Sequence, residues 1–85
     1  MAASRGNDNL VKNWRGLGSF QTSIKGLSAS YYTKDSSNNS YVKSGNLSKG
    51  TVVIYEDSQT LEHTRAAIRI GNDIFYTNID NLVKP

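Results

Sequence analysis

The chain has 85 residues and no cysteine, and its ten lysines and arginines outnumber its seven acidic residues, giving a formal net charge of +3. This length fits one domain at most, and without cysteine neither a disulfide framework nor a thiolate metal site can form. No apolar run marks a signal peptide or a membrane span, so we expect a cytoplasmic or virion protein with no membrane partner.

Positive charge gathers at the start of the chain. Residues 1–30 carry four basic residues and one acidic residue, whereas residues 31–85 carry six of each. The beginning is also poor in apolar side chains, which predicts a loosely ordered arm. We therefore divide the chain into a basic N-terminal arm, residues 1–19, and a folded domain, residues 20–85. Such an arm suits an anionic or polar partner, although its charge could equally serve only to solubilise the terminus.

A faint helical spacing marks the end of the arm. Leu10, Val11, Trp14 and Leu17 fall at i, i+1, i+4 and i+7, which predicts one or two helical turns before two glycines interrupt them. Trp14 is either an anchor for a partner's pocket or a lid over one end of the chain's own folded domain. The partner-binding residues that we expect in this region are Arg5, Lys12, Trp14, Arg15 and Lys25.

Short β segments separated by polar turns come next. Residues 18–25 alternate weakly, and residues 27–33 form a better strand. Residues 34–40 (KDSSNNS) predict a loop, because Asp, Asn and Ser side chains bond to nearby backbone groups in place of a strand partner. Beyond the loop we expect a brief extension at residues 41–42, a turn at 43–45, an extension at 46–48 and a turn at 49–50.

Residues 51–55 (TVVIY) form the strongest β segment of the chain. Three consecutive β-branched residues are typical of a central strand that is covered on both faces. Residues 56–59 are polar and predict a loop after this strand. Near the end of the chain, residues 78–81 predict a single 3₁₀ turn, and Leu82-Val83 predicts a last short strand.

A hairpin spans residues 64–82, with Gly71 in its turn. In the first limb the apolar even-numbered residues face one way and the arginines the other, as a half-buried strand requires. The register is open at this point. A two-residue loop would pair Ile68 with Phe75, whereas a three-residue loop would pair Ile68 with Tyr76 and turn the opposite face of the second strand inward.

About five short strands with glycine-marked turns predict an all-β fold, a small antiparallel barrel or sandwich. Residues 27–83 resemble the SH3-like barrel, in particular the bacterial and phage SH3 family. Residues 44–54 (SGNLSKGTVVI) are similar to the central strand motif of that family, residues 67–73 to its hairpin and residues 74–82 to its closing segment. The resemblance implies a binding module.

The sequence departs from the family where ligands are bound. Phe75 and Tyr76 stand where the family usually has Gly-Trp. Eukaryotic SH3 domains bind proline-rich ligands through a Tyr-bearing strand, an adjacent Trp and a Pro near the end. Tyr31 and Tyr32 are similar to the first of these, but the Trp and the Pro have no counterpart here. Peptidoglycan binding likewise has no identifiable residues behind it.

No catalytic or metal-binding constellation is recognisable. His63 is the only histidine, and its neighbour Glu62 would face the other way on a strand. Serine and threonine are abundant, but a nucleophile needs a base within hydrogen-bond reach. We therefore expect no enzyme activity, no cofactor and no metal.

Aromatic and basic residues suggest a second surface. Bases stack on exposed rings that are flanked by Lys or Arg, whereas tyrosines at strand ends are commonly half-buried core residues. The residues expected on this ligand or nucleic-acid face are Tyr31, Tyr32, Arg65, Arg69 and Tyr76.

We therefore expect a non-catalytic structural or adaptor module that binds a partner protein through its basic arm and barrel surface. Small barrels with basic N-terminal extensions recur among viral particle proteins, so a virus particle is one setting for it. Single-stranded nucleic-acid binding is the alternative function, and cell-wall binding is the third.

Overall fold

The computed structural model describes residues 10–62 and 64–84, which form seven strands and three short 3₁₀ helices. The expected all-β class is confirmed for this part of the chain. In chain order the elements are η1 (Val11–Trp14), β1 (Phe20–Ile24), β2 (Ser28–Asp35), β3 (Ser40–Ser48), β4 (Val52–Tyr55), η2 (Asp57–Gln59), β5 (Arg65–Ile70), β6 (Asp73–Asn78), η3 (Ile79–Asn81) and β7 (Leu82–Val83).

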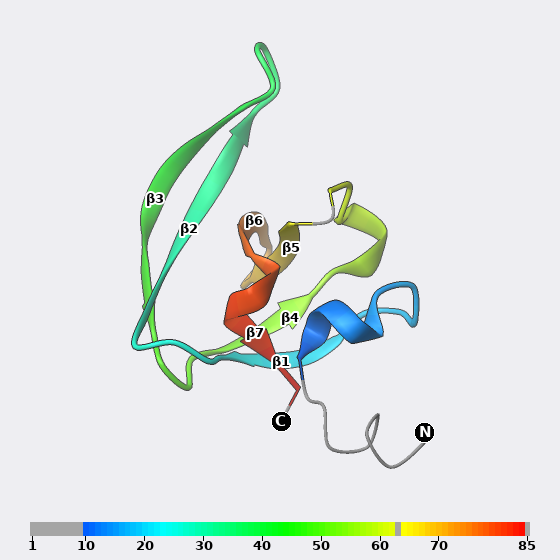
Figure 1. Cartoon of the computed structure of the whole chain (residues 1–85). Helices are drawn as coiled ribbons and strands as arrows, with labels where there is room; N and C mark the ends of the chain where they lie inside the picture. The colour runs from blue at the N-terminus through cyan, green and yellow to red at the C-terminus, as the bar shows by residue number, and fades with distance from the viewer. Residues whose placement is uncertain (1–9, 63, 85) are drawn as a thin grey trace.

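All seven strands belong to one antiparallel sheet with the order β3-β2-β6-β5-β4-β1-β7. The sheet curls, so that β2 and β3 rise on one side of the molecule while β1 and β4 cross its base (Figure 1). The count is seven and not about five, because β1 and β7 pair with each other at one end of the sheet and β3 is a full strand at the other. The predicted 3₁₀ turn before β7 is confirmed as η3.

The turn expected at residues 43–45 is wrong, because β3 runs unbroken beside β2. Tyr31 pairs with Gly45 and Tyr32 pairs with Lys43, so Ser44 is an extra residue that forms a β-bulge. A Cβ on Gly45 would lie 3.1 Å from Cε1 of Tyr31. The glycine therefore serves the close approach of an aromatic ring and not a chain reversal.

The β5–β6 hairpin has the two-residue loop. Ile68 pairs with Phe75, and Gly71 at the first loop position has a φ of 64°, as a type II′ turn requires. Tyr76 then pairs with Ala67, so Tyr76 faces the outer side of the sheet, which it shares with the two arginines of β5. Phe75 instead packs against the hydrophobic core.

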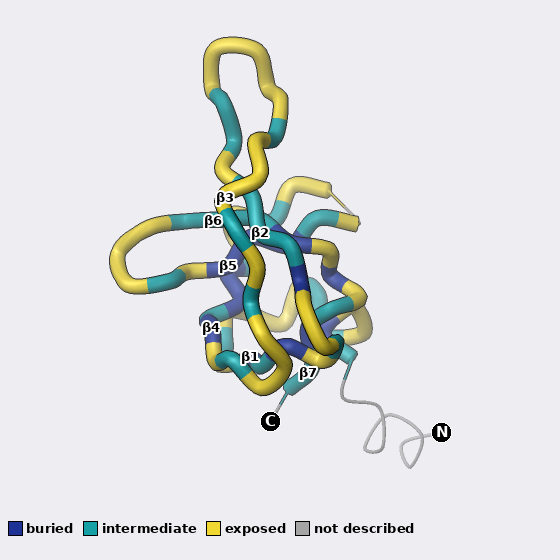
Figure 2. The backbone as a smooth tube through the Cα atoms, turned by 90° about the vertical axis from the view of Figure 1, so that its left-hand side faces the viewer, coloured by how far each residue is buried: buried dark blue, intermediate teal, exposed yellow. Residues whose placement is uncertain are grey.

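The core lies on the inner face of the curled sheet, and the tip of the β2–β3 hairpin stands exposed beyond it (Figure 2). The expectation that β4 is covered on both faces is wrong, because Val53 and Tyr55 are buried while Val52 is 56% exposed. An antiparallel sheet commonly has one face packed on the core and the other exposed to solvent. The β-branched run here reflects strand propensity more than burial.

Residues 10–19, which we assigned to a loosely ordered arm, pack onto the folded body. Val11 is fully buried in the hydrophobic core, and Leu10 forms a β-bridge with Val83. The segment is helical only in the short 3₁₀ helix η1. Sparse apolar residues suggested an arm, but one side chain such as Val11 is enough to close a small core. Arg5 and the rest of residues 1–9 lie outside the described residues.

Truncation of Val11 tests this correction. Val11→Ala should lower the free energy of unfolding by about 1–3 kcal/mol, because it removes fully buried methyl groups. Leu17→Ala, at a position that is 59% exposed, is the matched control and should change stability by less than about 0.5 kcal/mol. Urea denaturation measures both, and equal effects of the two substitutions would show that residues 10–19 are not part of the core.

Candidate functional site

A cluster of three tyrosines and one arginine lies on the outer face of the sheet. It consists of Tyr32 from β2, Tyr41 from β3, Arg65 from β5 and Tyr76 from β6, and we call it the tyrosine–arginine face. Strand pairing places Tyr32 opposite Tyr76. The guanidinium carbon of Arg65 lies 4.0 Å from the centre of the Tyr41 ring and 5.4 Å from that of Tyr32. Tyr41 also meets Tyr76 edge to face, with ring centres 5.4 Å apart.

Glu62 approaches this face from the loop before β5. The Tyr41 hydroxyl donates a hydrogen bond of 3.0 Å to Oε1 of Glu62, and Oε2 of Glu62 lies 4.0 Å from Nε of Arg65. Partial burial, together with the hydrogen bond to Glu62, raises the pKa of Tyr41 above its ordinary value. Tyr41 is therefore held as a neutral hydrogen-bond donor between two charged side chains.

A polar cavity of about 380 Å³ adjoins Arg65. Of the described residues that line it, only Arg65 carries a formal charge, and the others offer hydroxyl and amide groups. Part of this wall is already fixed, because the side-chain oxygen of Asn78 accepts a hydrogen bond from the backbone N–H of Asp80. The lining residues are Ser28, Ser30, Tyr32, Thr64, Arg65, Asn78 and Asn81.

Three residues of the expected ligand face come together here, and two do not. Tyr32, Arg65 and Tyr76 belong to the tyrosine–arginine face. Tyr31 points to the opposite side of β2, where its ring packs edge to face on Phe75 at 5.0 Å, because neighbouring residues of a strand face opposite ways. Arg69 shares the outer side but lies further along β5, where it forms an ion pair with Glu56.

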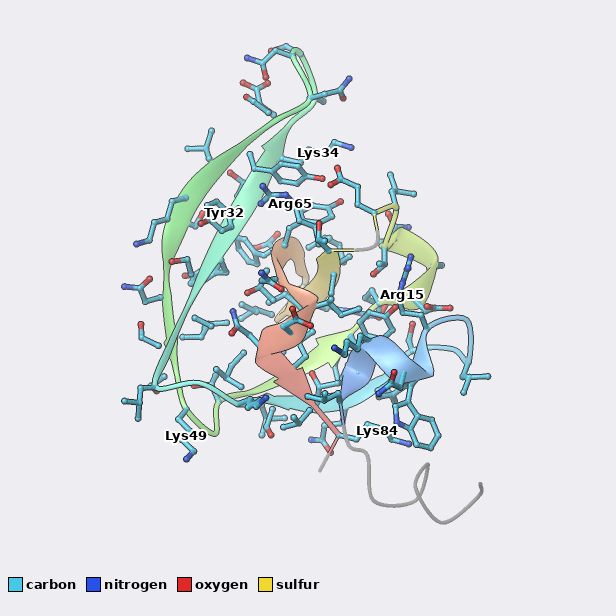
Figure 3. The ribbon with its side chains drawn as sticks, viewed as in Figure 1. Arg15, Tyr32, Lys34, Lys49, Arg65 and Lys84 are labelled. Atoms are coloured by element: carbon cyan, nitrogen blue, oxygen red, sulfur yellow. The ribbon has the colours of Figure 1, made fainter. Side chains whose placement is uncertain are left out.

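The sequence analysis did not identify two residues of this region, Tyr41 and Lys34. Tyr41 belongs to the face, and Nζ of Lys34 lies 5.9 Å from the Tyr41 ring centre. Figure 3 shows Tyr32, Lys34 and Arg65 between the β2–β3 hairpin and the start of β5. A regular β2–β3 hairpin pairs Lys34 with Tyr41, so a prediction of that hairpin would have placed both residues beside Tyr32. The turn expected at residues 43–45 excluded such a hairpin.

Two of the residues expected on the arm, Lys12 and Trp14, contact other side chains of the folded body. Nζ of Lys12 lies 3.8 Å from a carboxylate oxygen of Asp80, and Nζ of Lys84 lies 3.6 Å from the centre of the half-buried Trp14 ring. Lys25 is exposed at the end of β1. Arg15 and Lys84 lie well away from Arg65 (Figure 3), so this set and the tyrosine–arginine face are separate surfaces.

Asp57 ties the N-terminal segment to the end of β4. Its Oδ1 accepts hydrogen bonds of 2.9 Å from the Gly16 N–H and 2.8 Å from the Tyr55 hydroxyl, and its own N–H donates to Oγ of Ser19. The Gly16 N–H is the main reason that the pKa of Asp57 is lowered from its ordinary value of 3.8, with further contributions from Tyr55 and Arg15. Burial raises the pKa of Tyr55, and its bond to Asp57 adds to this.

Within residues 10–62 and 64–84, no three His, Cys, Asp or Glu side chains gather closely enough to hold a metal ion. His63 lies outside these residues. None of the described helices is long and apolar enough to cross a membrane.

Comparisons with known proteins identify no relative of this chain. No protein-family model matches the chain, and no curated protein or solved structure matches it. Function is therefore inferred from the residues and their geometry.

The role of Asp57 predicts a pH dependence. A carboxylate whose pKa is lower in the folded than in the unfolded chain contributes stability above pH 3.8, and this contribution is lost as the pH falls through the lower folded value. Asp57→Asn should therefore lower the unfolding free energy near neutral pH, and its difference from the wild type should shrink in acid. Urea denaturation between pH 2 and 7 measures this, and a difference that is constant with pH would contradict the assignment.

Proposed function

We propose that the protein is a non-catalytic binding module with an SH3-like barrel, and that it holds an extended segment of a partner protein at the tyrosine–arginine face. The resemblance over residues 27–83 supports the barrel. So does the succession of elements: a first strand, a long hairpin, β4, a second hairpin and a 3₁₀ turn lead to β7, which returns beside β1.

The observation that carries the proposal is the convergence of four side chains from four strands beside a polar cavity. Tyrosine and arginine are enriched among the residues that dominate protein interfaces. Binding pockets are concave, and the polar groups in them fix the orientation of the ligand. The strands also hold these side chains more rigidly than a loop would.

Because of this geometry, we propose that the partner binds the sheet and not the N-terminal arm. Lys12 and Trp14 already contact Asp80 and Lys84 within the folded body. A partner that used them would have to replace those contacts, whereas the cavity beside Arg65 is open to a ligand. A virus particle is a compatible setting on fold-level analogy alone.

Selection of binding peptides tests the proposal. A phage-displayed library of random dodecapeptides is panned on the full chain, and the enriched peptides are titrated against Tyr32→Ala. We expect at least about tenfold weaker binding, because truncation of an interface anchor costs more than about 1–2 kcal/mol. Val42→Ala is the control, since Val42 is exposed on the same hairpin next to Tyr41 but on the other side of the strand. Equal losses for both variants, or no enriched peptide, would contradict the proposal.

Single-stranded nucleic acid is the second candidate, because Lys34 and Arg65 both lie over the Tyr41 ring and bases stack on such rings. Oligothymidylate is titrated at low and at physiological salt. Under the main proposal we expect no binding that depends on Tyr32. Binding that weakens steeply with salt and is lost in Tyr32→Ala would favour nucleic acid, and co-sedimentation with peptidoglycan would favour the cell-wall alternative.

A further inference from the structure

We infer that the cavity beside Arg65 receives a carboxylate of the partner segment, so that the module selects acidic peptides. This ligand chemistry rests on the proposed function, since it names the group that enters the binding site. It is carried by the cavity wall, by the position of the Arg65 guanidinium and by the placement of Glu62.

The cavity wall suits an anion. Arg65 is the only charged residue among the described residues that line it, and no carboxylate belongs to that set. Serine, threonine and tyrosine hydroxyls and asparagine amides can all donate hydrogen bonds, and of these the Ser30 hydroxyl already donates to Oδ1 of Asn46. The side-chain oxygen of Asn78 accepts from Asp80, which leaves its amide N–H groups as the part able to serve a ligand. A negatively charged group would thus meet donors and one cation.

Arg65 is oriented for this task. Its guanidinium stacks 4.0 Å from the centre of the Tyr41 ring, which restricts a flexible side chain to one region. A guanidinium pairs with a carboxylate through two parallel N–H···O bonds. Glu62 does not make such a pair, because its nearer oxygen lies 4.0 Å from Nε, beyond hydrogen-bond distance. Glu62 therefore does not form the paired N–H···O bonds that Arg65 can make with a carboxylate.

Glu62 acts as an internal competitor for the ligand carboxylate. It is held beside Arg65 by the Tyr41 hydroxyl, and its side chain is half exposed. Its negative charge weakens the attraction between Arg65 and any other anion near the cavity. Removal of that charge should therefore strengthen the binding of an acidic peptide, whereas removal of the Arg65 charge should weaken it.

The charge of the site favours a carboxylate over a phosphate group. A phosphate monoester carries a charge between about −1.5 and −2 at neutral pH and is usually bound by several cations. Here one arginine lines the cavity and Glu62 stands beside it. One guanidinium matches one carboxylate in both charge and geometry.

The test is an NMR titration of the isotope-labelled full chain. The probes are N-acetyl tri-glutamate amide, its tri-glutamine counterpart of equal size, and the trinucleotide of thymidine. We expect the acidic peptide to shift the Arg65 Nε–H signal and the side-chain amide signals of Asn78 and Asn81, with an affinity at least about fivefold above that of the neutral peptide.

Three variants sharpen the test. Arg65→Gln should reduce the affinity for the acidic peptide by about tenfold or more. Arg69→Gln is the matched control, because Arg69 lies on the same strand and side but away from the cavity. It should leave the affinity for the acidic peptide unchanged. Glu62→Gln should increase it by several fold, which keeps the inference testable if Arg65→Gln does not fold.

Each contrary outcome is distinguishable. Equal affinity for the acidic and neutral peptides would overturn the carboxylate while leaving the binding face in place. Failure of the acidic peptide at the cavity, with library-selected peptides still dependent on Tyr32, would overturn the inference and not the proposed function. Stronger binding of the trinucleotide that is lost in Arg65→Gln would overturn it in favour of a phosphate ligand.

Discussion

The described structure depends on the register of β5 against β6. The two-residue loop that begins at Gly71 pairs Ile68 with Phe75 and so turns Phe75 toward the core and Tyr76 outward. Thr77, also buried, then donates a hydrogen bond to the Ser30 carbonyl and fixes β6 against β2. A slip of one residue would exchange the two faces of β6. The hydrophobic core and the tyrosine–arginine face therefore have one common origin, a tight turn whose first position has a positive φ.

The N-terminal segment completes this sheet in two ways. Val11 fills the core, and Leu10 pairs with Val83 so that the outer edge of the short strand β7 is partly covered. Asp57 secures the same segment through the Gly16 N–H. A chain of this length buries a modest share of its surface, so each additional buried side chain matters. A region whose composition resembles a solvated tail is thus part of the folded body.

The candidate site holds a positive and a negative side chain, Arg65 and Glu62, close together. Tyr41 holds Arg65 through its ring and Glu62 through its hydroxyl, so two opposite charges stand next to one cavity. Affinity there is a difference between the contacts that a ligand gains and those that it displaces. Because a fold of this kind can serve many functions, specificity has to come from such local arrangements and not from the sheet itself.

The sequence by itself determined the local structure of this protein: the alternation of residues 65–70, the turn at Gly71, the 3₁₀ turn before β7 and the all-β class follow from neighbouring residues. Only the tertiary structure decided that Val11 is buried, that β3 is continuous and that Tyr41 joins Tyr76. The physical reason is that local chemistry selects strands and turns, whereas burial and strand partners depend on segments far apart in the chain. Three of the four residues of the tyrosine–arginine face, Tyr32, Arg65 and Tyr76, were therefore foreseeable as residue types, whereas their assembly around Tyr41 was not.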